Sequence, residues 1–127
     1  MSLAVWCVLA AGLMPFLFTG IAKTLGRRYD NRQPRAWQTG LEGAPARAHA
    51  AHLNAFEAFP LFAAGVFFAQ QIGAAQDRVD QLALAFVLLR LGYGACYIAG
   101  WSTMRSLVWL AALVCSVALF FASPAGG

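Results

Sequence analysis

Charged side chains are scarce in this chain of 127 residues, and acidic ones are the scarcest. Only 11% of the residues are charged, and five of these are Asp or Glu, whereas 61% are hydrophobic. The mean hydropathy is +0.64. A soluble domain typically has ~25% charged residues, because polar groups must cover its surface. The shortage of charge therefore argues against a soluble domain and against a disordered chain.

Cysteine is also rare, and its placement excludes several kinds of structure. Cys7, Cys96 and Cys115 lie inside apolar runs, and none belongs to a Cys-x-x-Cys pair. This pattern is typical of small packing residues rather than of a disulfide framework. No basic residue precedes the first apolar run, so we do not expect a cleaved signal peptide. The glycine motifs GxGxxG and GxxxxGK[ST], which bind phosphates, are absent from the sequence.

Long apolar runs are what the chain does contain. A helix that crosses a bilayer needs about 20 apolar residues, and four runs meet this requirement. We expect helices over residues 3–26, 46–72, 79–101 and 104–123, within a single domain that spans residues 1–127. The runs lack a clean amphipathic period, as expected for helices that face lipid on most sides. The sequence therefore predicts an all-α, multi-pass membrane protein, a bundle of four transmembrane helices.

The basic residues indicate how the helices are oriented. The formal net charge is +4, and six Lys or Arg residues lie in or beside the first connection. The second connection has Arg78 against two Asp. Because Lys and Arg accumulate in cytoplasmic connections, we expect the first and third connections in the cytoplasm and both termini outside it. Membrane topology, rather than binding of nucleic acid, explains the basic charge.

Isolated charges inside the apolar runs are the strongest sign of a functional site. A charge at the bilayer centre costs roughly 2.5–3.5 kcal/mol on insertion scales, so such residues are rare and often functional. Glu57 lies ten residues beyond Arg47, which is about 15 Å along a helix. Arg90 lies at a similar depth on the next span, which runs in the opposite direction. We therefore expect an ion pair between Glu57 and Arg90.

Further polar residues fall on the same helix faces. At about 100° per residue, two faces collect them: Arg47, Asn54 and Glu57 on one helix, and Arg90, Tyr93 and Tyr97 on the next. Arg105 begins the fourth run, and either Arg27 or Arg28 can reach the same zone from the first. We expect these groups to form a pocket for a polar, anionic ligand, because arginine recognises carboxylates with two parallel hydrogen bonds.

Two other patterns have structural explanations. The four-residue spacing of Gly92, Cys96 and Gly100 predicts a face for close packing between helices. His49 and His52 point away from the polar face, and no carboxylate or cysteine accompanies them, so we expect no metal site. We place these two histidines in the interfacial layer or between subunits.

The order and spacing of the polar residues carry a family resemblance. Residues 47–62, RAHAAHLNAFEAFPLF, have the pattern Arg-x6-Asn-x2-Glu-x2-Pro. Residues 90–106, RLGYGACYIAGWSTMRS, have the pattern Arg-x2-Tyr-x3-Tyr followed by an arginine. With the four-span layout, these motifs resemble the MAPEG family, the membrane-associated proteins in eicosanoid and glutathione metabolism. The chain looks most like the short bacterial members of that family.

The resemblance implies an assembly, a ligand and a set of site residues. It implies a homotrimer in a bacterial inner membrane, with glutathione as co-substrate between neighbouring subunits in the cytoplasmic half. The implied glutathione-binding positions are Arg28 (with Arg27 as the alternative), Arg47, Asn54, Glu57, Arg90, Tyr93 and Tyr97. Arg105 would be the catalytic residue, because a nearby cation stabilises a thiolate. The thiolate would then attack a lipophilic electrophile dissolved in the membrane.

Three functions fit these residues. The first is a glutathione-dependent transferase or peroxidase that acts on lipophilic substrates. The second is a non-catalytic membrane scaffold or binding protein, in which Glu57 and Arg90 serve assembly. The third is a small proton-coupled multidrug transporter. An arginine partner for Glu57 argues against the transporter, since it would keep the carboxylate ionised.

Overall fold

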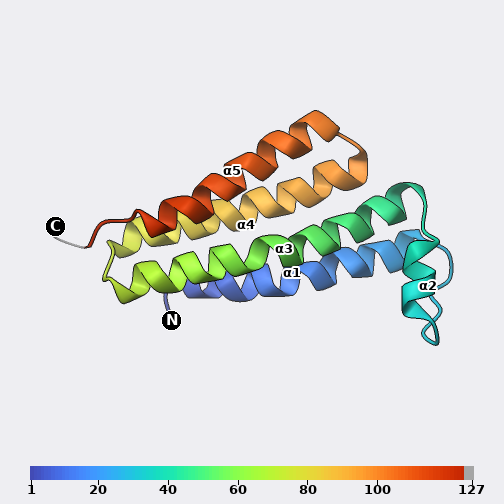
Figure 1. Ribbon diagram of the computed structural model, residues 1–127, viewed down its shortest axis with the longest axis horizontal. Helices are drawn as coiled ribbons and strands as arrows, with labels where there is room; N and C mark the ends of the chain where they lie inside the picture. Colours follow the sequence, from blue (N-terminus) through green and yellow to red (C-terminus); the bar gives the residue numbers. More distant parts are fainter. Residues whose placement is uncertain (125–127) are drawn as a thin grey trace.

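Four long helices make up most of the protein. The computed structural model describes residues 1–124. Its helices are α1 (Leu3–Leu25), α2 (Pro34–Thr39), α3 (Gly43–Gln71), α4 (Gln76–Ala99) and α5 (Ser102–Phe120). All except the short α2 run along the length of the molecule (Figure 1), and each is long and apolar enough to cross a membrane. The prediction of an all-helical chain with four membrane-spanning helices is confirmed.

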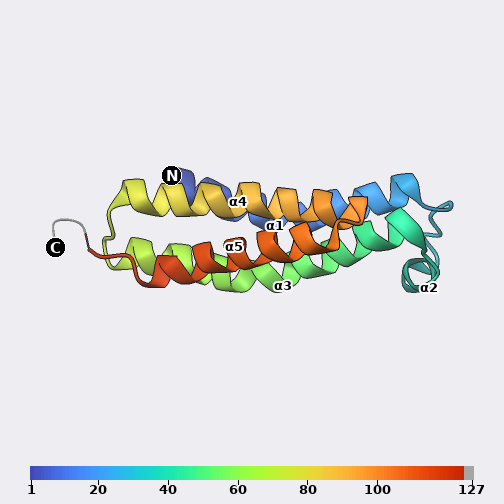
Figure 2. The ribbon, with the colours of Figure 1, turned by 90° about the horizontal axis from the view of Figure 1, so that it is seen from above.

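The long helices form a bundle in which α3 and α4 are central. Each of these two packs against the other and against both α1 and α5. Helices α1 and α5 lie on opposite flanks in Figure 1, and Figure 2, seen from above, shows α5 in front of α1. The α1–α3 connection and the α4–α5 turn lie at one end, called here the α2 end, whereas the α3–α4 turn lies at the other. The beginning of α3 and the end of α4 both lie at the α2 end. Residues in these two segments can therefore meet.

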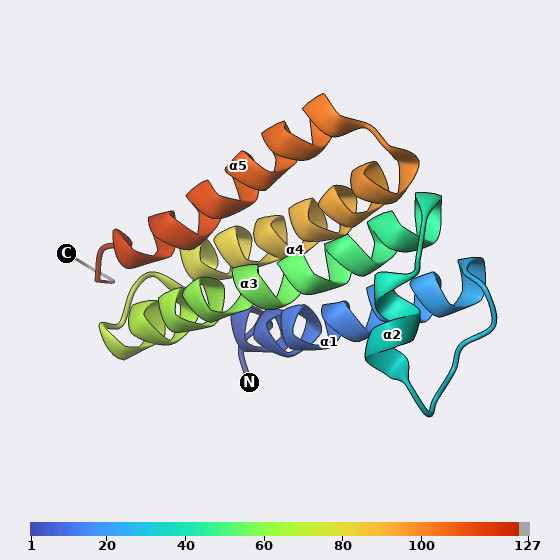
Figure 3. The same cartoon turned by 45° about the vertical axis from the view of Figure 1, so that its right-hand side comes forward.

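The first connection contains a short helix that the sequence analysis did not predict. Pro34 begins α2, where its missing N–H costs nothing. Trp37 is 2% exposed and packs with Ala22 of α1 and Ala48 of α3. Figure 3 shows α2 beside the end of α1. Proline also explains why α3 begins at Gly43 rather than at the expected residue 46. Pro45 lies in the first turn of α3, where a missing N–H is tolerated.

His52 is buried inside the subunit, between α3 and α1. Its Nδ1 lies 2.7 Å from the carbonyl oxygen of Pro15. A carbonyl can only accept a hydrogen bond, so Nδ1 carries the proton. The ring of His49 stacks on that of His52, with centroids 5.5 Å apart. The expected position between subunits is therefore wrong for His52, because a carbonyl of α1 gives its ring a partner inside the bundle.

Helix α4 packs tightly against α1 at Gly94. A Cβ atom added there would overlap the ring of Phe18. Gly92 has only Val108 at ordinary contact distance, and Gly100 ends α4 in the left-handed conformation (φ 81°). Within residues 1–124 of the single subunit, these two glycines therefore mark no close helix contact, and packing of this face against a second copy stays a prediction. Four-residue spacing identifies a row of small residues but does not tell which face of the helix meets a neighbour.

Candidate functional site

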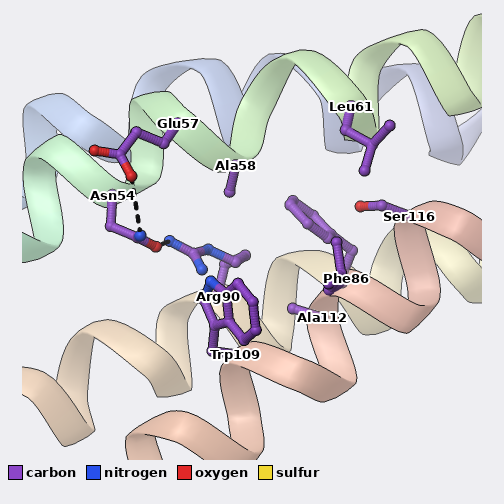
Figure 4. Close-up of a pocket in the computed structure, with 10 residues that line it drawn as sticks. Asn54, Glu57, Ala58, Leu61, Phe86, Arg90, Trp109, Ala112 and Ser116 are labelled. Atoms are coloured by element: carbon purple, nitrogen blue, oxygen red, sulfur yellow. Dashed lines mark hydrogen bonds between the residues drawn. The ribbon is translucent and has the colours of Figure 1, made fainter.

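A chain of hydrogen bonds joins α3 to α4 inside the bundle. Arg90 Nη2 donates to Asn54 Oδ1 at 2.6 Å. Asn54 Nδ2 in turn donates to Glu57 Oε2 at 3.4 Å. Figure 4 shows the three side chains in this order, with the amide in the middle. Arg90 is 2% exposed, so its guanidinium depends on these contacts inside the protein.

The predicted ion pair between Glu57 and Arg90 is wrong as a direct contact. Asn54 bridges the two charged groups, because a side-chain amide has both an acceptor and donors. The carboxylate of Glu57 lies on the exposed side of α3, whereas the guanidinium of Arg90 is buried. The buried cation therefore contacts a neutral amide and keeps much of its attraction for an anion.

A row of four side chains runs from α4 to α5, with two tyrosine rings between two arginine guanidinium groups. The guanidinium of Arg90 lies 4.2 Å from the centroid of the Tyr93 ring. The rings of Tyr93 and Tyr97 meet edge to face at 5.7 Å. The guanidinium of Arg105 lies 4.4 Å from the Tyr97 centroid. Cations over aromatic faces are attracted by the ring quadrupole, so this row fixes the orientation of both arginines.

The spacing of these residues explains how they come together. Arg90, Tyr93 and Tyr97 are three and four residues apart, which places them on one face of α4. Only Gly100 and Trp101 separate α4 from α5. The chain therefore reverses at once, and Arg105 in the first turn of α5 reaches the last turn of α4.

Two cavities adjoin this row of side chains. One, of about 200 Å³, lies between α3, α4 and α5, with Asn54, Glu57 and Arg90 at its polar end and Leu61 and Phe86 in its apolar wall. The other, of about 230 Å³, lies between α4 and α5. It is lined by Tyr93, Tyr97, Arg105, Ser106 and Trp109.

Trp109 lines both cavities, and the sequence analysis did not single it out. Phe86 and Ser116, which line the cavity between α3, α4 and α5, were missed as well. A signal for Trp109 was present, because it follows Arg105 by four residues and so shares its helix face. Phe86 and Ser116 stand among apolar neighbours, and no spacing rule separates them from ordinary core residues.

Two predicted site residues lie outside the row. Arg47 is partly buried, and its Nε donates to the carbonyl oxygen of Ile98 at 3.0 Å. It thereby satisfies one of the carbonyls that the end of α4 leaves without a partner. Arg28 is exposed at the α2 end. Arg27, the alternative to it, bonds through Nη2 to the carbonyl oxygen of Trp37 at 3.0 Å.

The charges around the cavities favour an anion. Arg90 and Arg105 are the cations that line the two cavities, against the single carboxylate of Glu57 among the lining residues. Within residues 1–124 the guanidinium of Arg105 makes no hydrogen bond, and its donors are available to a ligand. An arrangement of this kind suits a ligand that has carboxylate groups or an anionic sulfur.

The fold and the site together define an all-helical, multi-pass membrane protein with a cationic cluster between its helices. The model of the MAPEG family matches residues 3–124, which is nearly the whole chain. The chain therefore belongs to the MAPEG family, as its motifs indicated. Members of this family include glutathione transferases and peroxidases. No curated protein and no solved structure matches the chain.

Proposed function

We propose that the protein binds glutathione at this cationic cluster and catalyses its reaction with lipophilic electrophiles, as a transferase or a peroxidase. One observation carries the proposal: an unbroken row of contacts runs from Asn54 through Arg90, Tyr93 and Tyr97 to Arg105 beside two cavities. Family membership supports the choice of glutathione, since known members include enzymes that use it.

The residues present fit a tripeptide with two carboxylates and a thiol. The guanidinium groups of Arg47, Arg90 and Arg105 are donors suited to carboxylates. Asn54 adds an amide, and Glu57 adds a carboxylate that can accept from an ammonium group. The two cavities measure about 200 and 230 Å³. Each is smaller than the roughly 300–1,000 Å³ of most ligand pockets, so the tripeptide would extend over both.

The chemistry that we propose needs a cation and no proton-carrying base. Bound glutathione would supply the thiolate nucleophile. The positive charge of Arg105 would stabilise the negatively charged sulfur of the thiolate. The ring of Tyr97 contacts the guanidinium of Arg105 and holds it in place. The apolar wall that includes Leu61 and Phe86 would keep a lipophilic electrophile near the polar end of the cavity between α3, α4 and α5.

We also propose that three copies assemble, with glutathione between neighbouring subunits. Glu57 is exposed although it lies near the middle of the 29-residue helix α3. A carboxylate in contact with lipid at that depth is unfavourable, so a neighbouring subunit or a ligand should cover it. Arg28, exposed in a single subunit, would reach the ligand of a neighbour.

The charge distribution supports a topology for the assembly. The α2 end carries the basic first connection, and the opposite end carries Asp77, Arg78 and Asp80. By the excess of Lys and Arg in cytoplasmic connections, we propose that the α2 end faces the cytoplasm and both termini lie outside it. The resemblance to short bacterial members supports a bacterial inner membrane.

Calorimetric titration of glutathione into the purified protein in detergent tests the proposed function. We expect binding at micromolar to low-millimolar concentration. Arg105→Ala and Asn54→Ala should each weaken it roughly ten- to hundredfold, since hydrogen bonds to charged groups contribute about 1.5–3 kcal/mol. Arg78→Ala, at the opposite end of the bundle, is the control and should bind as the unmodified protein does. No binding at millimolar glutathione would contradict the proposal.

A non-catalytic scaffold is the second candidate, and two contacts favour it. Arg47 bonds to the end of α4 and Arg90 bonds to Asn54, so both cations already join helices. In that case glutathione should not bind, and Asn54→Ala should only destabilise the bundle. The exposed position of Glu57 supports the transporter hypothesis. Proton-coupled dye export that depends on Glu57 would identify the protein as a transporter.

A further inference from the structure

A surface of exposed cations surrounds the α2 end of the bundle. We call it the basic collar, and its members are Lys23, Arg27, Arg28, Arg32 and Arg35. Residues 23–47 contain six Lys or Arg and two acidic residues, a net charge of +4. This equals the formal net charge of the whole chain. The positive charge of the protein is therefore concentrated at one end.

The collar has a defined conformation. Trp37 Nε1 donates to the carbonyl oxygen of Arg27 at 3.0 Å, and Arg27 Nη2 donates back to the carbonyl oxygen of Trp37 at 3.0 Å. The ring of Tyr29 meets that of Trp37 edge to face at 5.0 Å. Lys23 Nζ lies 4.1 Å from the Tyr29 centroid. Because Trp37 is buried against α1 and α3, these contacts attach the collar to the membrane-spanning helices.

Acidic residues of the described chain do not neutralise the collar. Asp30 accepts from the backbone N–H of Arg32, at 2.9 Å, rather than from its guanidinium. The guanidinium of Arg35 donates to the neutral amide of Gln38, at 3.2 Å. Within residues 1–124 no carboxylate forms an ion pair with a collar cation. The collar therefore presents uncompensated positive charge to its surroundings.

The position of the collar identifies its partner. Leu25, the last residue of α1, is 52% exposed, and the basic residues stand on both sides of it. The collar thus begins where the apolar span ends, at the depth of lipid headgroups. From this juxtaposition of fixed, unpaired cations with the end of the span, we propose that the collar binds the phosphate-bearing headgroups of anionic phospholipids. Each Lys or Arg held near an anionic leaflet contributes to such binding.

This proposal does not depend on glutathione binding. The collar residues Lys23, Arg32 and Arg35 do not line the two cavities, and no site role is assigned to them. Arg28 is excluded from the test because it belongs to the proposed glutathione site. Nucleic acid has the same phosphate chemistry, but four membrane-spanning helices hold the collar against the lipid surface, where headgroups are always present.

Lipid selectivity in reconstituted vesicles tests the proposal. The full chain is placed in phosphatidylcholine vesicles that contain spin-labelled phosphatidylglycerol or spin-labelled phosphatidylcholine, and the ratio of their association with the protein is measured. We expect a preference for phosphatidylglycerol of about fivefold, the factor that one basic residue near an anionic surface supplies. It should fall as salt rises from 0.1 to 1 M, because the Debye length shortens from about 10 to 3 Å.

Two variants test whether the collar residues cause the preference for phosphatidylglycerol. The triple variant Lys23→Gln, Arg32→Gln, Arg35→Gln should bind both lipids almost equally, whereas Arg78→Gln, an exposed arginine at the opposite end, should keep the preference of the unmodified protein. Equal thermal unfolding of the three proteins would show that the bundle is intact. A preference retained in the triple variant, or lost equally in Arg78→Gln, would overturn the proposal. Binding of labelled single-stranded RNA without any lipid preference would overturn it too, and would assign the collar to nucleic acid.

Discussion

Asn54 is the residue on which the buried charge of this protein depends. It gives Arg90 its only side-chain hydrogen bond within residues 1–124. A buried charged donor that loses its acceptor cannot recover the hydrogen bond from water, so the loss is larger than the value of an ordinary surface contact. The amide therefore has a structural role in addition to any contact with a ligand.

Replacing Asn54 should destabilise the bundle according to what the new side chain can accept. We expect Asn54→Ala to lower the free energy of unfolding by about 1.5–3 kcal/mol, the range for hydrogen bonds to charged groups. Asn54→Asp keeps an acceptor for Arg90 and should be at least as stable as the unmodified protein. Thermal unfolding in detergent measures both. Equal stability of the alanine variant and the unmodified protein would show that Arg90 finds another partner.

At the scale of single residues, the sequence predicted which side chains gather but not every contact between them. The helix faces that bring Arg90, Tyr93 and Tyr97 together follow from spacing alone. Whether Arg90 and Glu57 touch does not follow from spacing, because it depends on how far each side chain reaches across two helices. Asn54, one turn from Glu57, intervenes for that reason.

At the scale of elements, the beginning of α1 is tied to α4. Asp80 Oδ1 accepts from the backbone N–H of Ala4 at 2.9 Å and from Gln76 Nε2 at 2.8 Å. The first N–H groups of a helix have no partner within it, and negative charge is favourable there. A residue 76 positions away in the sequence thus caps the first helix.

Loss of this cap should be measurable. We expect Asp80→Ala to lower the free energy of unfolding by about 0.5–2 kcal/mol, the usual effect of removing an N-terminal cap. Asp77→Ala, which removes an exposed carboxylate from the first turn of α4, is the matched control and should have a smaller effect. Hydrogen exchange of the first amides of α1, followed by mass spectrometry, should rise in Asp80→Ala alone. Identical exchange in the two variants would argue against a cap.

The existence of the long helices was predictable, and their ends were less so. A run of about 20 apolar residues has few alternatives to a helix in lipid, because every backbone polar group must be satisfied internally. Helix α2 has no such run and forms because Trp37 finds a place between α1 and α3. Its formation depends on tertiary contacts, which a pattern of residues in a loop does not reveal.

At the scale of the whole molecule, the single subunit leaves much apolar surface exposed. Helix α5 is the least covered of the four spans. Its side chains Leu107, Leu110 and Val114 are each more than half exposed. Lipid can cover these groups, but it cannot cover Glu57 at low cost. The proposed trimer would bury the polar side of α3 and leave apolar surface to the bilayer.

The mass of the protein in detergent should therefore correspond to three copies of the 13.6 kDa chain. Light scattering corrected for bound detergent measures this mass. We expect Glu57→Arg, which reverses the exposed charge, to shift the population towards single subunits, whereas Arg78→Glu at the beginning of α4 should not. A single-subunit mass for the unmodified protein, with glutathione binding intact, would contradict the proposed assembly.

How the helices neighbour one another was not predictable from their composition. Each span is apolar on most sides, so the sequence does not mark the face that meets a partner. The central position of α3 and α4 becomes clear only from features such as Gly94, which accepts the ring of Phe18. The short connections limited the possible arrangements, because helices joined by a few residues must lie side by side.

The two-residue turn between α4 and α5 limits where insertions can be tolerated in this protein. With only Gly100 and Trp101 outside the helices, the rotational phase of α5 is set by that of α4. One inserted residue would turn Arg105 by about 100° about the axis of α5, away from Tyr97. Insertions in the connection between α1 and α3 carry no such penalty for this pair. Natural variation in chain length should therefore be tolerated before α3 and rejected at residues 100 and 101.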